Sequence, residues 1–314
     1  MKTALLFPGQ GAQTVGMGSD IVENFPEAAE IFKKADDVLG FNLSQICFRG
    51  PEETLNTTTI SQPAIFVTSA AILEVLRSRR SNGAFVNADV AAGLSLGEYT
   101  ALYAAGMLSF ADAVVLVQRR GYAMQTASDD AKGTMVCIIG LDEAAVNALC
   151  TEASRGQLLT AVNFNCPGQI VISGAKGACD RAEALADKYG AIKTIRLHVA
   201  GAFHTEMMTP AVDILRKALA NPEIHNPGRT RIIANINAEY YTSSEGIAEG
   251  LIKQLTSPIL WQKCMERLLA DDVEEFYEIG PGKVLAGLMK RISRKTKITS
   301  IGTLEELRQI ISEA

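Results

Sequence analysis

The clearest chemistry in the sequence is a serine between two glycines, the GxSxG segment at residues 93–97. It follows an apolar run of small residues and precedes a helical pattern. Glycines at these positions let a strand turn sharply into a helix, which lifts the serine hydroxyl out of the sheet edge. The backbone N–H of Leu96 would then point at an oxyanion formed beside Ser95. We therefore predict a nucleophile at Ser95, although five residues of this kind also fit a purely structural turn.

A serine nucleophile needs a base, and the chain offers three histidines. His204 lies in a loop of small residues just after a predicted strand, where active-site residues of open α/β sheets are commonly found. His198 falls inside a predicted strand at 192–199, which favours a core or edge histidine. His225 lies in a proline-rich surface loop and is expected to be solvated. His204 is therefore the predicted base.

Two further features could serve the same site. The glycine-rich turn at 7–13, Phe-Pro-Gly-Gln-Gly-Ala-Gln, could present a second backbone N–H to an oxyanion, or could be a tight turn alone. Arg120 falls on the apolar stripe of a predicted helix at 111–127. An arginine on a buried face needs a carboxylate or phosphate partner. Periodicity alone favours an internal salt bridge to Asp or Glu.

The elements that position these residues follow from hydrophobic patterning. Helical patterns extend to about residue 80, including 61–77, and a loop rich in Ser, Asn and Gly follows at 81–87. Short apolar runs alternate with helices and predict buried strands, at residues 3–7, 89–93, 231–236 and 274–279. This alternation predicts an α/β fold with a mostly parallel sheet.

The middle of the chain has a different rhythm. Its pattern reads strand, helix, strand, strand, helix, strand, at residues 134–140, 143–153, 159–165, 169–174, 178–188 and 192–199. That order is the split β-α-β pattern of a ferredoxin-like module. We therefore predict a small subdomain at 131–199, inserted into a catalytic domain formed by 1–130 and 200–314.

Composition narrows the possible functions. Of the 314 residues, 47% are hydrophobic, and the net charge of −5 implies no basic surface for nucleic acid. Six cysteines show no metal-ligand spacing and are expected as core residues of a reducing, cytoplasmic compartment. The N-terminal apolar run breaks at Pro8, too early for a signal peptide, and we expect no uninterrupted apolar stretch long enough to span a membrane. No metal site is expected.

Taken together, the sequence resembles the malonyl-CoA:acyl carrier protein transacylases and the acyltransferase domains of fatty-acid and polyketide synthases. The matching motifs occur in family order over nearly the whole chain: Phe7-Pro-Gly-Gln-Gly-Ala-Gln, Gly93-Leu-Ser-Leu-Gly-Glu-Tyr, Gln118-Arg-Arg-Gly, Val162-Asn-Phe-Asn-Cys-Pro-Gly-Gln, Gly201-Ala-Phe-His-Thr, Gln254-Leu-Thr-Ser-Pro and Glu278-Ile-Gly-Pro-Gly-Lys-Val-Leu.

The resemblance implies a fold and a reaction. The fold would be an α/β-hydrolase-like core carrying a ferredoxin-like subdomain. Ser95 would take a malonyl group from malonyl-CoA as an ester, with His204 as general base, and pass it to the phosphopantetheine thiol of an acyl carrier protein. A backbone carbonyl at Gln254 would orient the imidazole. Such enzymes serve fatty-acid biosynthesis and related lipid metabolism, need no cofactor, and are expected to be monomers.

The resemblance also assigns the remaining site residues. The N–H groups of Gln10 and Leu96 would form the oxyanion hole. Arg120 would bind the free carboxylate of malonate, which replaces the internal salt bridge that periodicity favours. Phe203 would crowd the methyl group of methylmalonyl. One position departs from the family pattern, since Leu94 stands where a histidine usually precedes the nucleophile; that histidine is not the base, so activity should survive.

Two other functions stay open. An esterase or thioesterase shares the GxSxG elbow, but the sequence lacks an HGGG-type oxyanion motif and a long segment follows His204. An esterase for neutral acyl groups would have no use for Arg120. A non-catalytic module that only docks a carrier protein would not need Ser95, His204, Gln10 and Arg120 together.

Overall fold

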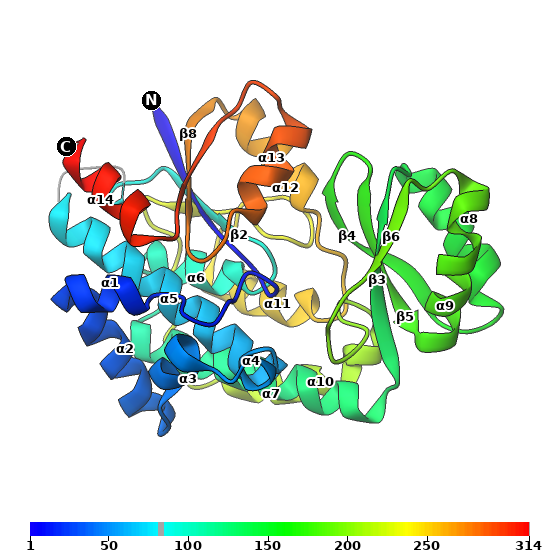
Figure 1. The fold of residues 1–314 in the computed structure, drawn as a ribbon, viewed down its shortest axis with the longest axis horizontal. Helices are drawn as coiled ribbons and strands as arrows, with labels where there is room; N and C mark the ends of the chain where they lie inside the picture. The colour runs from blue at the N-terminus through cyan, green and yellow to red at the C-terminus, as the bar shows by residue number, and fades with distance from the viewer. Residues whose placement is uncertain (81–84, 314) are drawn as a thin grey trace.

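The computed structural model describes residues 1–80 and 85–313, which form a larger and a smaller lobe (Figure 1). The larger lobe is built on a parallel sheet and the smaller lobe on an antiparallel sheet. The predicted α/β class with a mostly parallel sheet is thereby confirmed. The predicted loop at 81–87 falls partly outside the described residues.

Every strand pair in the larger sheet is parallel. In their order across the sheet, the strands are β7 (Arg231–Ile232), β2 (Val90–Gly93), β1 (Lys2–Phe7), β8 (Val273–Ile279) and β9 (Ile298–Ile301). The short edge strand β9 was not predicted, because the sequence pattern there gives no strand signal. It also extended β7 to residue 236, whereas the strand ends at 232. The parallel arrangement brings the carboxyl ends of β1 and β2 together, where the glycine-rich turn and the serine elbow follow.

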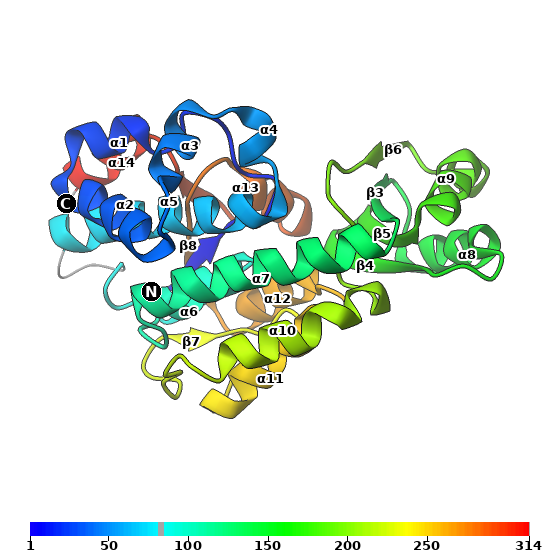
Figure 2. The same ribbon diagram turned by 90° about the horizontal axis from the view of Figure 1, so that it is seen from below.

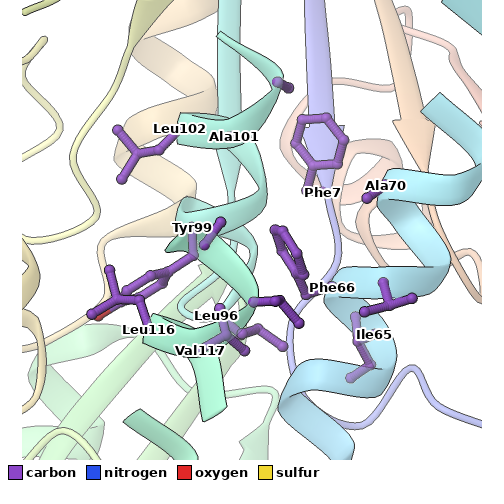
Figure 3. Close-up of a cluster of buried hydrophobic side chains, with 14 of the residues drawn as sticks. Phe7, Ile65, Phe66, Ala70, Leu96, Tyr99, Ala101, Leu102, Leu116 and Val117 are labelled. Carbon is purple, nitrogen blue, oxygen red and sulfur yellow. The ribbon is translucent and has the colours of Figure 1, made fainter. Parts of the chain in front are cut away.

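The central strand β1 is buried on both faces. Leu5 and Phe7 belong to the core beneath α5, α6 and α7, while Ala4 and Leu6 belong to the core beneath α12 and α13. Figure 3 shows Phe7 pointing into the first of these cores, beside Phe66 of α5. A strand with both faces buried reads as a continuous apolar run, which is why the sequence predicted it.

Helices cover both faces of this sheet. Their bounds are α1 (Ser19–Asn24), α2 (Pro26–Leu39), α3 (Leu43–Arg49), α4 (Glu52–Leu55), α5 (Thr58–Arg79), α6 (Gly97–Ala104), α7 (Phe110–Asp130), α10 (Thr209–Leu219), α11 (Ser244–Gln254), α12 (Trp261–Ala270), α13 (Val284–Ile292) and α14 (Leu304–Ser312), with a short 3-10 turn, η2, at Glu206–Met208. The predicted helices at 61–77 and 111–127 correspond to α5 and α7.

Helix α5 is the most apolar of the long helices. It is long and apolar enough, by length and composition, to cross a membrane, with a mean hydropathy of 1.5 in its most apolar window. The helix includes Gln62, Thr68, Ser69 and Glu74, so it is not an uninterrupted apolar stretch of the kind that was not expected. In addition, 83% of that window is buried inside the protein, which is what the central helix of a large hydrophobic core shows.

The smaller lobe is a sheet with two helices on one face. Its elements are β3 (Gly133–Ile139), α8 (Glu143–Ser154), β4 (Leu159–Cys166), β5 (Gln169–Ala175), α9 (Lys176–Leu185), the 3-10 turn η1 (Ala186–Tyr189) and β6 (Lys193–Arg196). The strand order is β4-β5-β3-β6 and all three pairs are antiparallel. This is the pairing of a split β-α-β module. The last strand is shorter than the predicted 192–199.

Two connections hold the smaller lobe against the larger one. Helix α7 runs the length of the larger lobe and leads directly into β3, as Figure 2 shows. Strand β4 bonds to the segment before α12: the N–H of Phe164 donates to the Ile259 carbonyl at 2.9 Å, and the N–H of Ile259 donates to the Val162 carbonyl at 2.7 Å. Backbone hydrogen bonds thus join the smaller lobe directly to the larger one.

Candidate active site

Ser95 lies on a sharp turn between β2 and α6. Its φ of 52° is in the left-handed region, which non-glycine residues rarely adopt. A Cβ added at Gly93 would lie 1.9 Å from the carbonyl carbon of Gly97, so only glycine allows the strand and the helix to approach this closely. The Ser95 N–H donates to Oδ1 of Asn235 at 2.6 Å, which fixes the turn. This is the geometry of a nucleophile elbow.

His204 lies directly opposite the serine. Its Nε2 is 3.0 Å from Ser95 Oγ, and its Nδ1 is 2.8 Å from the backbone carbonyl oxygen of Gln254. The carbonyl can only accept, so Nδ1 carries the proton and Nε2 is free to accept the serine proton. Burial lowers the pKa of His204 to about 3, and the nearby Arg120 cation adds to this effect, while the bond to Gln254 opposes it. The imidazole is therefore neutral at physiological pH.

Arg120, on α7, is 1% exposed and reaches the same serine. One terminal nitrogen donates to Gln62 Oε1 at 2.8 Å, and the other donates to Ser95 Oγ at 2.9 Å and to Gln254 Oε1 at 2.8 Å. Its Nε has no partner within the described chain. None of the ion pairs found in residues 1–80 and 85–313 includes Arg120. The internal salt bridge that periodicity favours is thus absent there, and the two terminal nitrogens donate to neutral groups only.

The glycine-rich turn after β1 packs against the elbow. A Cβ added at Gly9 would lie 2.5 Å from the Leu94 carbonyl oxygen, so the two backbones touch. Gln10 borders the same pocket as Ser95. Among the described residues, no acceptor is recorded for the backbone N–H of Gln10 or of Leu96. Both amides named in the sequence analysis are therefore placed at the serine without an internal partner.

These groups surround a pocket with about 470 Å³ of empty space, including its open mouth. Both lobes contribute to its lining, which consists of Gly9, Gln10, Leu94, Ser95, Arg120, Met124, Met135, Asn163, Leu197, Val199, Phe203 and His204. The polar side chains of the wall are those of Gln10, Ser95, Arg120, Asn163 and His204, and the remaining side chains are apolar. Phe203, next to the base, is held through its carbonyl, which accepts from Ser173 Oγ at 2.9 Å. Leu94, the residue before Ser95, also lines this pocket.

The structure also shows polar residues that sequence analysis did not single out. Asn235 spans the elbow, accepting from Ser95 and donating from Nδ2 to the Gly93 carbonyl at 2.8 Å. Glu98 lies fully buried behind it. One signal could have found Asn235, because it is a polar residue just beyond the carboxyl end of a parallel strand. Gln62 gives no such signal, since it is one polar position on an apolar helix.

The other two histidines and the six cysteines do not line this pocket. His198 was predicted inside a strand but follows the end of β6 and is exposed, because β6 stops at Arg196. His225 is exposed, as expected for its loop. All six cysteines are free and buried. Within residues 1–80 and 85–313, no group of three or more His, Cys, Asp or Glu is placed to hold a metal ion.

Comparison with known proteins gives a consistent result. The family model described as the acyl transferase domain matches residues 4–308. The malonyl CoA-acyl carrier protein transacylase of Haemophilus influenzae is 43% identical over 291 residues, which cover 93% of this chain and 92% of that protein. The enzyme of the same name from Bacillus subtilis is 41% identical over 307 residues, covering 98% of this chain and 95% of its own.

Solved structures agree with these relatives. A malonyl-transacylase in complex with its type II polyketide acyl carrier protein superposes with a TM-score of 0.94 at 37% identity, covering 100% of both chains. The acyl carrier protein S-malonyltransferase of Vibrio cholerae gives a TM-score of 0.92 at 39% identity, covering 99% of this chain and 100% of its own. The chain therefore belongs to the acyl transferase family, in the group of the malonyl CoA-acyl carrier protein transacylases.

Proposed function

We propose that this acyltransferase moves a malonyl group from malonyl-CoA to the phosphopantetheine thiol of an acyl carrier protein through an ester on Ser95. One observation carries the proposal. The Ser95 hydroxyl oxygen lies 3.0 Å from the neutral base His204 and 2.9 Å from the buried cation Arg120. A nucleophile beside both a base and an unpaired cation suits an acyl group that ends in a carboxylate.

Acylation follows from the positions of the protons. Ser95 donates its hydroxyl proton to His204 Nε2 while Oγ attacks the malonyl thioester carbon. The C–S bond then breaks, and the imidazolium returns this proton to the departing coenzyme A thiolate. The Gln254 carbonyl holds the Nδ1 proton throughout, so the ring keeps one orientation. The products are the malonyl ester of Ser95 and free coenzyme A.

The oxyanion formed at the thioester carbonyl needs donors on the opposite side from the base. The N–H groups of Gln10 and Leu96 are the candidates, because Gln10 borders the pocket, Leu96 directly follows Ser95 in the chain, and neither amide has an acceptor recorded in the described chain. Leu96 stands immediately before the first turn of α6, so its amide also carries the positive end of that helix. Each such donor stabilises the transition state by about 3–4 kcal/mol.

The second half of the reaction reverses the first with a different thiol. His204 takes the proton of the phosphopantetheine thiol as its sulfur attacks the ester carbon, and Ser95 leaves with that proton restored. The carrier protein departs as its malonyl thioester. Coenzyme A and the carrier end in the same phosphopantetheine arm, so one pocket can accept both in turn. The relatives named above, one of them solved with its carrier protein, support this choice of partners.

Selection for malonyl would rest on Arg120. The malonyl carboxylate is separated from the ester carbon by one methylene, so it lies within reach of a guanidinium that already contacts Ser95 Oγ. An acetyl group would leave this buried cation with neutral partners only. Phe203 closes the pocket beside the base and would crowd a methyl branch on the acyl chain.

We extend the proposal to the setting of the enzyme. The reaction exchanges one thioester for another through a serine ester without oxidation or reduction, which needs no redox cofactor. His204 supplies the base and the backbone amides the oxyanion donors, so we propose that no metal takes part. We propose a monomer, as the resemblance to this family implies, and size-exclusion chromatography with light scattering tests this state. Free, buried cysteines suit a reducing cytoplasm. Malonyl carrier protein is the expected supply for chain extension in fatty-acid biosynthesis.

The proposal is tested by weighing the intact protein after incubation with malonyl-CoA, acetyl-CoA or methylmalonyl-CoA. We expect a malonyl-sized adduct that maps to Ser95, that holo-acyl carrier protein removes, and that Ser95→Ala does not form. Consumption of malonyl-CoA without transfer to the carrier would instead indicate a thioesterase. Carrier binding without any acyl-enzyme would indicate a docking module. Either result rejects the proposed transfer.

A further inference from the structure

Glu98 is a buried carboxylate directly behind the serine elbow. It occupies the first turn of α6 and is 0% exposed. One carboxylate oxygen accepts from the Tyr241 hydroxyl. The other accepts from the Asn235 backbone N–H at 3.1 Å and from Gln254 Nε2 at 2.9 Å. Its recorded partners are all donors, so the ionised carboxylate satisfies this arrangement without a proton.

The Gln254 carboxamide joins this anion to the buried cation. Its oxygen accepts from Arg120 at 2.8 Å, and its nitrogen donates to Glu98 at 2.9 Å. The same nitrogen also donates to the Ser95 carbonyl at 3.2 Å. An amide that accepts from a cation on one side and donates to an anion on the other is fixed in a single orientation. Its own backbone carbonyl orients His204.

The two buried charges are therefore close but not paired directly. Arg120 forms no ion pair within the described residues, and the Gln254 amide lies between it and Glu98. Burial raises the pKa of Glu98, while its three hydrogen-bond donors and the attraction of Arg120 oppose that rise. A direct Glu98–Arg120 pair would occupy the guanidinium. The interposed amide keeps the charge balance and leaves the guanidinium facing the serine.

We propose that Glu98 is the indirect counter-ion of Arg120, a positioning residue that acts through Gln254 and sets how strongly the site binds an acyl carboxylate. This inference rests on the proposed function, in which Arg120 receives that carboxylate. Because Glu98 is negative, it weakens the pull of Arg120 on a bound malonyl group. It also favours the imidazolium of His204 that forms when Ser95 attacks. The residue thus limits ground-state binding and assists proton transfer.

Glu98→Gln is the variant that tests the charge. A glutamine oxygen can accept from Asn235 and Gln254, and its nitrogen can donate to the Tyr241 oxygen, so the shape and most hydrogen bonds persist. Binding is measured by calorimetry in a Ser95→Ala background, which prevents acylation. We expect the Kd of malonyl-CoA to fall about tenfold on removing this nearby charge, while the Kd of acetyl-CoA stays within about twofold. With Ser95 present, Glu98→Gln should lower kcat.

Two further variants separate charge from packing. Tyr241→Phe removes the hydroxyl bond to Glu98 but no charge, so it should lower the melting temperature and leave the ratio of the malonyl-CoA and acetyl-CoA Kd values unchanged. Glu98→Asp keeps the charge, so the same ratio should also persist. If Glu98→Gln does not fold, Glu98→Asp becomes the test. A change in its ratio of malonyl-CoA to acetyl-CoA Kd values would then overturn the inference.

The failure of this inference is distinct from failure of the proposed function. If Glu98→Gln leaves the ratio of the two Kd values unchanged, Glu98 is neutral or structural and the counter-ion role is wrong, although Ser95 of the wild-type protein still takes up malonyl. If wild-type Ser95 forms no malonyl ester, or Ser95→Ala binds malonyl-CoA no more tightly than acetyl-CoA, the proposed function itself fails.

Discussion

His204 takes its orientation from a peptide group, since its Nδ1 lies 2.8 Å from the backbone carbonyl oxygen of Gln254. In a serine protease the corresponding partner is a carboxylate, which also stabilises the imidazolium by its charge. A carbonyl fixes the tautomer but contributes only a dipole. The nearby Arg120 cation disfavours the imidazolium further. The base is therefore held in its neutral form, and this has a consequence for pH dependence.

We expect kcat/KM for malonyl-CoA to stay level from about pH 8 to below pH 6, because burial lowers the pKa of His204 to about 3. The same shift affects stability. Between about pH 6.5 and 3 the unfolded chain binds a proton at this histidine and the folded protein does not, so the free energy of unfolding decreases on acidification. Circular dichroism at each pH should therefore accompany the rate measurements, to show that the protein is still folded. An acidic limb centred near the ordinary histidine value would contradict the prediction.

Arg120→Ala should abolish the preference for malonyl-CoA over acetyl-CoA. The variant lacks the buried cation that would bind the malonyl carboxylate. We therefore expect kcat/KM for malonyl-CoA to fall by about 100- to 1,000-fold and the value for acetyl-CoA to change little. Arg120→Lys should recover only part of the preference, because an ammonium lacks the planar fork. The matched control is Arg119→Ala, the exposed neighbour on the same helix, which should match the wild type. A mutant that keeps its malonyl preference would refute the role of Arg120.

Phe203→Ala should admit branched substrates. Phe203 is buried beside His204 and lines the pocket, and one methyl group is worth about 1–3 kcal/mol in such a site. We expect the ratio of methylmalonyl-CoA to malonyl-CoA acylation rates to rise about 10- to 100-fold, with Phe203→Leu in between. Competition between the two thioesters, followed by intact-protein mass spectrometry, measures this ratio directly. An unchanged ratio would place the methyl-sensing wall elsewhere.

Asn235→Ala should destabilise the elbow. It removes the acceptor of the Ser95 N–H and the donor to the Gly93 carbonyl, and leaving both groups buried without partners costs about 2–4 kcal/mol. Chemical denaturation measures the change in the free energy of unfolding. Asn237→Ala, at an exposed position two residues away, should shift it by less than about 0.5 kcal/mol. Equal changes in the two variants would show that the hydrogen bonds of Asn235 do not stabilise the elbow.

The serine–histidine pair could be predicted because its signals are local. The elbow needs a strand, two glycines and a helix within a few residues, and the choice among three histidines depended on the small-residue loop before His204. The periodicity of α7 placed Arg120 on a buried face, but periodicity cannot say what faces it. The expected salt bridge was wrong because the nearest partners are carboxamides from two distant helices.

The buried hydrogen-bond network of Glu98 behind the elbow could not be predicted from local signals. Glu98 meets its partners across 137 to 156 residues of sequence, at Asn235, Tyr241 and Gln254. Such contacts depend on how α6 packs against loops that leave no periodic signal. The short strands were missed or misjudged for a related reason: β9 has four residues and β7 only two, too few for a pattern to emerge.

In the chain, the inserted lobe lies between Ser95 and His204, the proposed nucleophile and base. Ser95 belongs to the framework of the parallel sheet, whereas His204 stands where the chain returns from the lobe, and the carbonyl of Phe203 is still bonded to Ser173 of β5. The approach of His204 Nε2 to Ser95 Oγ therefore depends on contacts from both lobes, through the Gln254 carbonyl in the larger lobe and through Ser173 in the smaller one. The 3.0 Å separation of Ser95 Oγ and His204 Nε2 thus reflects how the two lobes are positioned relative to each other.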